Sequence, residues 1–421
     1  MPHAFSARAC GLDFGTSNST VGWVRPGKET LLPLEDGKVT LPSVVFFNAD
    51  EDSTCFGRAA LQEYLAGYEG RLMRSMKSLL GSRLIDGRTE VHGRSLLFRD
   101  LLSQFIGELK RRADLHGESA FEHVVLGRPV YFVDDDPVAD RRAEATLAEI
   151  ARSIGFKEVS FQFEPIAAAF HYETEIHREE LVLVADIGGG TSDFSLVRLS
   201  PQRAARPDRR EDLLANGGVH IGGTDFDRLF SLASVMPLFG FRSLLKNQRE
   251  MPSRIYYDLA TWHSINAAYT YRVLTEQKRF SFDAQEPEKT ARLLTLIEKR
   301  AGHWLANEVE QAKITLSDQE STTLVLDRIE TDLRRQLTRD EFDAATTGLV
   351  GKIEAKLGVL LRDAGVAPER IDTIFFTGGA SGVPHLRRRL AALLPQARPV
   401  EGDLFGSIGA GLAIEAARRY G

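Results

Sequence analysis

Cysteine is nearly absent from this sequence of 421 residues, which contains Cys10 and Cys55 and no others. Two isolated cysteines match none of the paired spacings of a zinc site, and they provide no disulfide framework. Such scarcity is typical of proteins kept in a reducing compartment. The sequence therefore predicts a cytoplasmic protein.

Long apolar runs, a targeting segment and an excess of basic residues are also missing. No stretch approaches the roughly 18 apolar residues that a membrane span needs, and the first residues lack the apolar core of a signal peptide. The sequence has 53 lysines and arginines against 59 aspartates and glutamates. We therefore expect no membrane contact and no nucleic acid as the main partner.

The segment Leu181–Leu199 carries the strongest chemical signal. An apolar, strand-like run leads into three glycines, and a second strand-like run leaves them. Glycines let the backbone approach a ligand closely, and their N–H groups suit phosphate oxygens. Asp186 and Asp193, which flank the glycines, would repel phosphate unless a cation such as Mg²⁺ lay between. Taken alone, the glycine triplet is equally compatible with an ordinary hairpin.

A second stretch of the same kind lies near the amino terminus. Asp13 ends a short apolar run, a glycine and hydroxyl residues follow, and a second strand-like run begins near Val21. Asp13 and Asp186 lie 173 residues apart, a little under half of the chain. Self-similarity at this distance predicts a duplicated fold in which two phosphate hairpins face one another.

Hydrophobic periodicity and capping signals predict most of the other elements. A helix starting at Glu164 carries small residues that would allow close contact with another helix, and a similar small-residue start follows Gly402. Residues 240–292 match no pattern. The other expected elements are strands at 31–34, 40–47, 124–132 (broken by Pro129) and 371–377, helices at 59–81, 98–109, 137–154 and 294–317, and a glycine turn at 216–227 that leads into a helix.

Taken in this order, the motifs resemble the ATPase domain of the DnaK-type (heat-shock protein 70) chaperones, within the actin and sugar-kinase superfold. The matching segments are the two hairpins, the two small-residue helices and the turn Thr377–Ser381. Glu310–Ser317 is similar to the family's adenosine-contacting helix, and Lys77 falls where the family keeps its catalytic lysine. The resemblance implies an α/β actin-like ATPase fold with two lobes, each built on a duplicated ribonuclease H-like sheet with flanking helices. Lobe I would be residues 1–180 and lobe II residues 181–421, with an outer subdomain at 225–317.

The resemblance also implies ATP or ADP and Mg²⁺ as ligands. Asp13 and Asp186 would hold Mg²⁺ through water. The implied catalytic residues are Lys77, Glu164, Asp186, Thr191 and Asp193, of which Glu164 and Asp193 would order the attacking water. The implied nucleotide-binding residues are Asp13, Gly15, Thr16, Ser17, Asn18, Gly188, Gly189, Gly190, Thr191, Gly222, Gly223, Glu310, Lys313, Gly378, Gly379, Ser381 and Asp403.

The sequence departs from the family in four places. The family has an arginine eight residues after the proline matched by Pro129, and here that position is Pro137, with Arg141 nearby. Ile314 and Gly382 stand where the family usually has adenine-stacking arginines, which predicts a looser adenine clamp. Residues 240–292 do not follow the family closely. The sequence stops soon after Asp403, so we expect no peptide-binding domain, and in this respect the chain is similar to the short, stand-alone, YegD-type members.

The resemblance implies slow, Mg²⁺-dependent ATP hydrolysis by a chaperone-type ATPase. We expect it to act as a nucleotide switch, as a monomer or through a protein partner in trans. The alternative enzyme is a small-molecule kinase of the same superfold, with Glu164 or Asp193 as the substrate base. The alternative structural protein is an ATP-dependent, filament-forming relative of actin.

Overall fold

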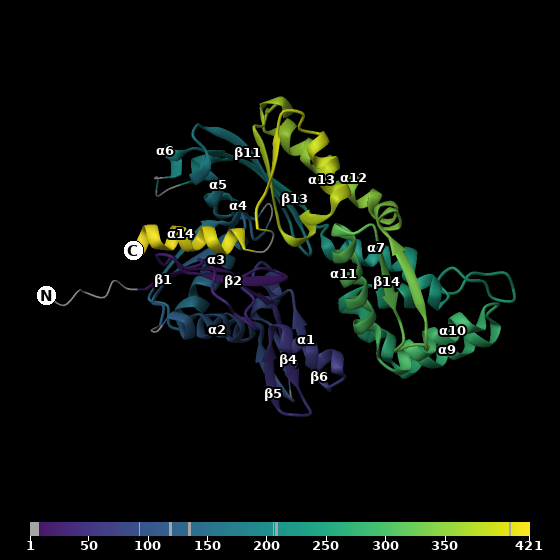
Figure 1. The fold of residues 1–421 in the computed structure, drawn as a ribbon. Helices are drawn as coiled ribbons and strands as arrows, with labels where there is room; N and C mark the ends of the chain where they lie inside the picture. Colours follow the sequence, from purple (N-terminus) through teal and green to yellow (C-terminus); the bar gives the residue numbers. More distant parts are fainter. Residues whose placement is uncertain are drawn as a thin grey trace. The chain divides into compact units, whose positions relative to one another are not determined.

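The computed structural model describes residues 8–91, 93–117, 120–133, 136–204, 206, 209–403 and 406–421. The chain divides into two compact units (Figure 1). Unit 1 is Met1–Val219, Lys356–Ser381 and Leu390–Gly421, and unit 2 is His220–Ala355 and Gly382–Arg389. This division differs from the predicted lobes at 1–180 and 181–421, which stay a prediction.

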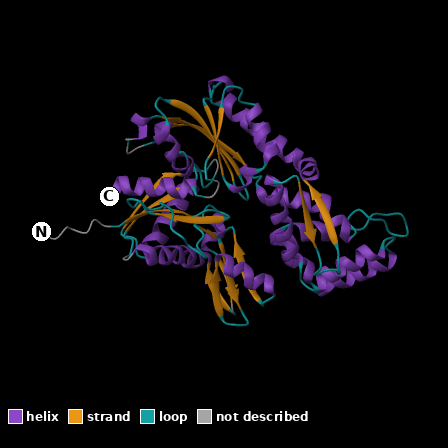
Figure 2. Ribbon diagram, viewed as in Figure 1, coloured by secondary structure: helices purple, strands orange, loops and turns teal. Residues whose placement is uncertain are grey.

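Unit 1 contains two five-stranded sheets with the same topology (Figure 2). In each sheet three antiparallel strands continue into two parallel strands, in the orders β3-β2-β1-β9-β10 and β13-β12-β11-β16-β17. This repeated order confirms the actin-like ATPase fold and the duplication. The strands of the first sheet are β1 Ala9–Asp13, β2 Asn18–Gly22, β3 Thr40–Pro42, β9 His123–Arg128 and β10 Glu158–Phe163. Those of the second are β11 Glu180–Ile187, β12 Ser192–Leu199, β13 Leu213–Val219, β16 Thr373–Thr377 and β17 Arg398–Glu401.

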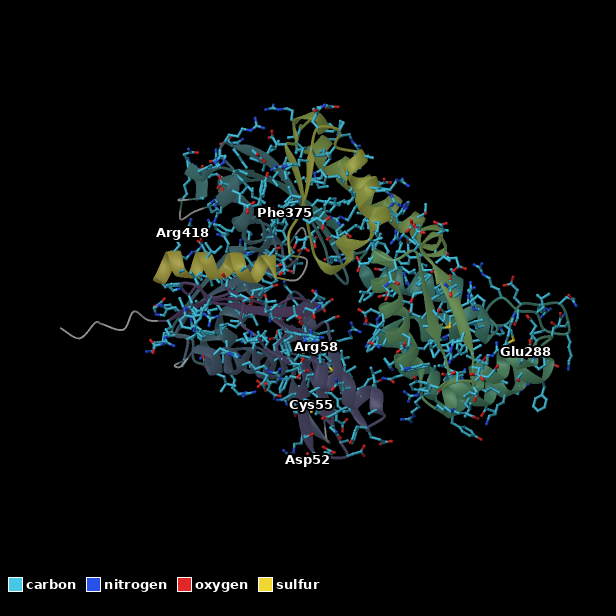
Figure 3. The ribbon with its side chains drawn as sticks, viewed as in Figure 1. Asp52, Cys55, Arg58, Glu288, Phe375 and Arg418 are labelled. Carbon is cyan, nitrogen blue, oxygen red and sulfur yellow. The ribbon has the colours of Figure 1, made fainter. Side chains whose placement is uncertain are left out.

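Three smaller sheets accompany them. They are β4 Val44–Asn48 with β5 Ser53–Phe56 and β6 Gly70–Arg74, β7 Arg88–Val91 with β8 Arg94–Leu97, and β14 Ser321–Val325 with β15 Arg334–Thr338. Cys55 lies on β5 (Figure 3). Its thiol donates to the Glu63 carboxylate. Desolvation, followed by the nearby Glu63 carboxylate, raises the pKa of Cys55 to about 11, so this thiol is a poor nucleophile at neutral pH.

Helices of unit 1 form where the sequence carries their caps and apolar faces. The Asp136 side chain accepts from the N–H groups of Val138 and Ala139, and Pro137 is the first helical residue of α3. Residues of α2 on one face, including Leu102 and Phe105, are fully buried. The helices that lie wholly in unit 1 are α1 Gly57–Ala66, α2 Phe98–Gly117, α3 Pro137–Ser153, α4 Glu164–Ala168, α5 Phe170–Glu175, α6 Pro201–Ala204 and α14 Ser407–Tyr420.

The two helices predicted from small residues, α4 and α14, pack directly on each other (Figure 1). A Cβ atom added at Gly411 would lie 1.9 Å from the Ala167 carbonyl oxygen. Leu412 and Ala416 of α14 share one buried cluster with residues of α4 and β11. Close packing of the small-residue helices is therefore confirmed, and it joins the two sheets.

Unit 2 is mainly helical. It holds α7 Gly223–Phe230, α8 Arg254–Ala260, α9 Tyr271–Asp283, α10 Pro287–Glu298 and α11 Gly302–Asp318, together with the β14–β15 pair. Two further helices, α12 Arg339–Asp363 and α13 Pro384–Ala392, run from one unit into the other. Residues 240–292, which matched no sequence pattern, begin here with turns and isolated bridges and continue from Arg254 as short helices. In the described part of the chain, no helix combines the length and apolar character that crossing a membrane requires.

Several predicted elements are wrong. The helix expected at 59–81 ends at Ala66, because Gly67 adopts a left-handed conformation and the chain then pairs with β4 as β6. The helix expected at 294–317 is two helices, broken near Arg300, which has a positive φ of 48°. Residues 31–34 form no strand beyond an isolated bridge at Leu31, and 216–219 belong to strand β13 instead of a turn. The 40–47 segment divides into β3 and β4, which lie in different sheets.

Candidate active site

The turns of the two glycine hairpins meet in unit 1. The β1–β2 hairpin pairs Asp13 with Thr20, and the β11–β12 hairpin pairs Asp186 with Asp193. A Cβ atom on Gly189 would lie 2.2 Å from Ser17 Oγ, so the two turns are in contact. The predicted facing of the hairpins is therefore present.

Two glycines lie against the carboxylates of the second hairpin, and glycine is required at one of them, Gly378. Gly378 follows β16 with a positive φ of 81°, and a Cβ atom there would lie 2.5 Å from Asp186 Oδ1. At Gly218 a Cβ atom would lie 2.2 Å from Asp193 Oδ1. The Asp193 carboxylate also accepts from Thr191 Oγ1 at 2.7 Å. Backbone that comes this close fixes the orientation of both carboxylates.

Lys77 lies beside Glu164, although 87 residues separate them in the chain. Its ammonium donates to Glu164 Oε1 at 2.5 Å, and both side chains are largely buried. Lys77 sits on a 3-10 turn, Met76–Leu79, that begins after Ser75, whose backbone is left-handed with φ 57°. Glu164 is the first residue of α4. The structure thus brings two of the predicted catalytic residues into one ion pair.

Four carboxylates and the Lys77 ammonium act on one another here. Desolvation, then the charge of Glu164, raises the pKa of Asp13 to about 7, although Lys77 opposes this. Desolvation, then Asp193 and Glu164, raises the pKa of Asp186 to about 8. Burial alone would lower the pKa of Lys77, but the surrounding carboxylates outweigh it and the pKa is raised. The site holds more negative charge than Lys77 neutralises.

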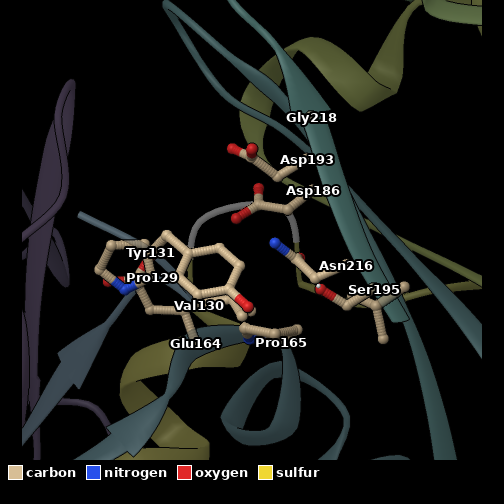
Figure 4. Close-up of a pocket in the computed structure, with 11 residues that line it drawn as sticks. Pro129, Val130, Tyr131, Glu164, Pro165, Asp186, Asp193, Ser195, Asn216 and Gly218 are labelled. Atoms are coloured by element: carbon tan, nitrogen blue, oxygen red, sulfur yellow. Dashed lines mark hydrogen bonds between the residues drawn. The ribbon is translucent and has the colours of Figure 1, made fainter. Parts of the chain in front are cut away.

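A pocket opens beside this ion pair (Figure 4). Asp186 and Asp193 project into it from the second sheet, and Glu164 and Tyr131 lie across from them. The cavity is about 50 Å³, which suits a few ordered waters. It is lined by Pro129, Val130, Tyr131, Glu164, Pro165, Val184, Asp186, Asp193, Ser195, Asn216 and Gly218.

Sequence reasoning missed several residues that shape this site. Ser43 is fully buried, its hydroxyl donates to the Gly15 carbonyl at 2.7 Å and its N–H donates to the Ser17 carbonyl at 2.8 Å. It therefore holds the first hairpin turn. A lone serine inside an apolar run was the signal that could have singled it out. Asn216, which accepts from Ser195 Oγ at 2.8 Å, was read as part of a turn.

The comparison with known families agrees with this geometry. The family model described as Hsp70 protein matches residues 9–96, 87–233 and 281–417. The chain belongs to the Hsp70 family. The family match leaves residues 234–280 uncovered, a range that overlaps most of the 240–292 segment, which does not follow the family closely in the sequence.

Curated relatives carry chaperone names. The chain is 27% identical over 427 residues to the chaperone protein HscA homolog of Aromatoleum aromaticum, covering 97% of this chain and 57% of that protein. It is 27% identical to the chaperone protein DnaK of Thermosipho africanus, covering 97% and 58%. Against DnaK of Thermus thermophilus the identity is 26%, covering 96% and 60%. The chain thus spans little more than half the length of these Hsp70 relatives.

The remaining residues implied by the Hsp70 resemblance lie in both units. Gly15, Thr16, Gly188 and Gly190 lie in the two hairpin turns, and Asn18 begins β2. In the same unit, Ser381 Oγ donates to the Gly378 carbonyl at 2.7 Å beside Gly379, and the Asp403 carbonyl accepts from Ser407 Oγ at 2.6 Å ahead of α14.

In unit 2 the implied residues lie on α7 and α11. The N–H of Gly222 donates to the Asp225 carboxylate at 3.1 Å, which caps α7 at Gly223. Lys313 on α11 pairs with Asp227 at 2.8 Å, and Glu310 lies one turn before it. Ile314, at an arginine position of the Hsp70 family, is 48% exposed.

The site residues fit a divalent cation held through water. No group of three or more His, Cys, Asp or Glu side chains, among those the structure describes, is close enough to bind an ion directly. Desolvation, followed by neighbouring carboxylates, raises the pKa values of Asp13 and Asp186, and a cation between the hairpins would favour the charged form of both groups. Carboxylates that reach an ion through its waters suit Mg²⁺, which retains much of its hydration shell.

Proposed function

We propose that this chain binds ATP with Mg²⁺ and hydrolyses it slowly. The Lys77–Glu164 ion pair beside the carboxylates of both hairpins is the observation that carries the proposal. Phosphoryl transfer needs positioned charge more than a strong base, and this site concentrates donors, an ammonium and carboxylates at one point.

Each side chain has a separate task in this proposal. Lys77 and Thr191 contact the γ-phosphate, while amides of Gly188–Gly190 and the Ser17 hydroxyl hold the phosphate oxygens. Glu164 and Asp193 orient the attacking water in the pocket that they line. Asp13 and Asp186 would hold Mg²⁺ through water, and the ion would neutralise charge on the phosphates.

The adenosine would be bound by residues around Gly378 in unit 1. Gly222 and Glu310, which the Hsp70 resemblance also implies, lie in unit 2. Lys313 already has a carboxylate partner in Asp227, so we propose that it orders α7 and α11. An apolar, exposed Ile314 offers dispersion contact to a base but no guanidinium face. This favours modest nucleotide affinity.

The biological role that we propose is that of a chaperone-type nucleotide switch. Membership of the Hsp70 family and the names of the HscA and DnaK relatives support it. The proposed setting is the cytoplasm, and a protein partner acting in trans would read the nucleotide state.

The test is calorimetric titration of ADP with Mg²⁺ and again with EDTA, followed by single-turnover phosphate release from ATP. We expect measurable binding only with Mg²⁺, since the carboxylates would otherwise repel the phosphates. Affinity that EDTA leaves unchanged contradicts the cation requirement, and no phosphate release contradicts hydrolysis.

The kinase alternative is tested by adding glucose or glycerol to the same assay. We expect an unchanged rate of ATP consumption and free phosphate as the product. A phosphorylated polyol among the products would favour the kinase.

A further inference from the structure

The segment Pro129–Tyr131 forms one wall of the active-site pocket, opposite Asp186 and Asp193 (Figure 4). It follows β9, which ends at Arg128, and it precedes α3. In a segment outside strands and helices, the backbone N–H and C=O groups have no regular hydrogen-bond partners. Other groups therefore have to form hydrogen bonds with them.

Arg128 makes these bonds to the wall. Its Nε donates to the Pro129 carbonyl at 3.0 Å, and its Nη2 donates to the Val130 carbonyl at 3.0 Å. Two consecutive carbonyls are therefore fixed by one planar guanidinium, whose donors form a rigid fork.

The guanidinium is itself anchored to α3. Nη2 donates to both oxygens of Asp140, at 2.9 and 3.1 Å, and Nη1 donates to Glu144. Asp140 Oδ1 also accepts from the Phe132 N–H at 2.6 Å, so the same carboxylate holds the far end of the segment. The Arg128 and Asp140 side chains are only 13% and 12% exposed, and charge-assisted bonds with little water around them hold geometry firmly.

Arg128 also contacts the segment that bears Glu164. Its guanidinium lies 5.3 Å from the ring centroids of both Phe132 and Phe163. Phe163 is the residue before Glu164, at the cap position of α4. One side chain therefore touches the wall of the pocket and the start of the helix that presents Glu164.

We propose that Arg128 is a positioning residue, which fixes the Pro129–Tyr131 wall and the start of α4 so that Glu164 faces a pocket of constant shape. The inference rests on the proposed hydrolysis. A lysine at this position keeps the charge, but its single nitrogen cannot occupy the positions of Nε, Nη1 and Nη2.

The test compares Arg128→Lys with Arg112→Lys in the full chain. Arg112 is a matched control on α2, because it is 17% exposed, pairs with Glu108 and donates to the Leu34 carbonyl at 2.9 Å. We expect Arg128→Lys to slow single-turnover hydrolysis about 10-fold to 100-fold, as small misplacements do, while ADP affinity stays at the wild-type value. Arg112→Lys should change neither quantity, although both variants lower the unfolding temperature.

Arg128→Lys with the wild-type hydrolysis rate would overturn the inference, and so would a loss of rate that Arg112→Lys reproduces. If Arg128→Lys does not fold, Asp140→Asn replaces it, because it weakens the anchor and leaves the guanidinium in place. It should slow hydrolysis in the same direction, and a wild-type rate in that variant also overturns the inference. A wild-type chain that binds ADP without releasing phosphate from ATP refutes the proposed function, and the inference with it.

Discussion

Lys77 is the residue on which the proposed chemistry depends most directly. Its ammonium is held at 2.5 Å from Glu164, and the carboxylates around it keep it protonated by raising its pKa. Lys77→Ala removes a preorganised positive charge from the place where the γ-phosphate would lie. We expect single-turnover hydrolysis to fall about 10²-fold or more, with ADP binding retained.

Lys110→Ala is the control for Lys77→Ala. Lys110 is also a buried lysine, 2.6 Å from Asp114, but it lies on α2 away from the pocket residues. Its removal should lower stability and leave the hydrolysis rate per folded molecule unchanged. If Lys77→Ala hydrolyses ATP at the wild-type rate, Lys77 is only a structural ion-pair partner.

Asp186 makes the stability of the nucleotide-free protein depend on pH. Its pKa is about 8 in the folded chain against an ordinary value of 3.8. Between these values the folded state binds more protons than the unfolded state, so the free energy of unfolding falls as the pH rises. Asp186 does not lower the free energy of unfolding below about pH 4, and it lowers it by the full amount above its pKa in the folded chain.

Asp186→Asn removes this titration. We expect the unfolding free energy of the wild type to drop between pH 5.5 and pH 8.5 by about 1 kcal/mol or more beyond the drop in the variant. Urea unfolding at both pH values, without nucleotide or Mg²⁺, measures the difference. Parallel pH dependence in the two proteins would show that Asp186 ionises normally.

At the residue scale, the sequence predicted groups with recognisable local patterns and missed those defined by tertiary contact. Asp186 and Gly189 lie in a short motif that can be read directly. Ser43 and Arg128 carry no such motif, and their bonds to the first hairpin and to the pocket wall exist only once strands and loops are packed.

The crossing of α4 and α14 is the element that joins the two sheets. A Cβ atom added at Gly411 would lie 1.9 Å from the backbone oxygen of Ala167. Backbone of a packed helix cannot yield as a side chain can, so Gly411→Ala should destabilise the chain by about 1–3 kcal/mol. Chemical denaturation of the purified variant measures this.

Gly348→Ala provides the opposite control for Gly411→Ala. Gly348 is exposed on α12, and a Cβ atom there meets nothing within 4 Å. Alanine should therefore stabilise α12 by about 0.5–1 kcal/mol through its better helix propensity. A neutral Gly411→Ala would mean that α4 and α14 are free to separate.

Helices and strands were predicted correctly where neighbouring residues determine them, and were missed where a distant partner does. The cap at Asp136 and the apolar face of α2 are written in adjacent residues, and both helices formed as expected. The 59–81 segment has helical periodicity, but pairing of Gly70–Arg74 with β4 overrides it. Such strand pairing depends on a partner more than 20 residues away and leaves no signal in the segment itself.

At the scale of the whole molecule, duplication was predictable and its extent was not. The two similar hairpin sequences predicted the duplication, and the two five-stranded sheets repeat one topology. The second sheet is completed by β16 and β17, which follow β13 only after residues 220–355 of unit 2. No local pattern indicates that Thr373–Thr377 pairs with β11, which lies nearly 200 residues earlier.

The contact between the two hairpins allows a test of whether they bind the phosphates of one nucleotide together. Ser17 lies in the turn between β1 and β2 of the first sheet, and Gly189 lies in the turn between β11 and β12 of the second. A Cβ atom on Gly189 would lie 2.2 Å from Ser17 Oγ. Gly189→Ala should displace the Ser17 hydroxyl and weaken binding of Mg²⁺ and ADP. Ser17→Ala should also weaken it, because a hydroxyl donor to phosphate is lost.

The double variant decides between two independent phosphate loops and one shared cradle. Removing Ser17 Oγ leaves room for the new methyl group, so the combined loss of binding free energy should be smaller than the sum of the single losses. We expect a coupling of about 0.5–3 kcal/mol in calorimetric titrations, as for residues in direct contact. Strict additivity would mean that the hairpins bind phosphate separately, and the argument that they converge on one nucleotide would fail with it.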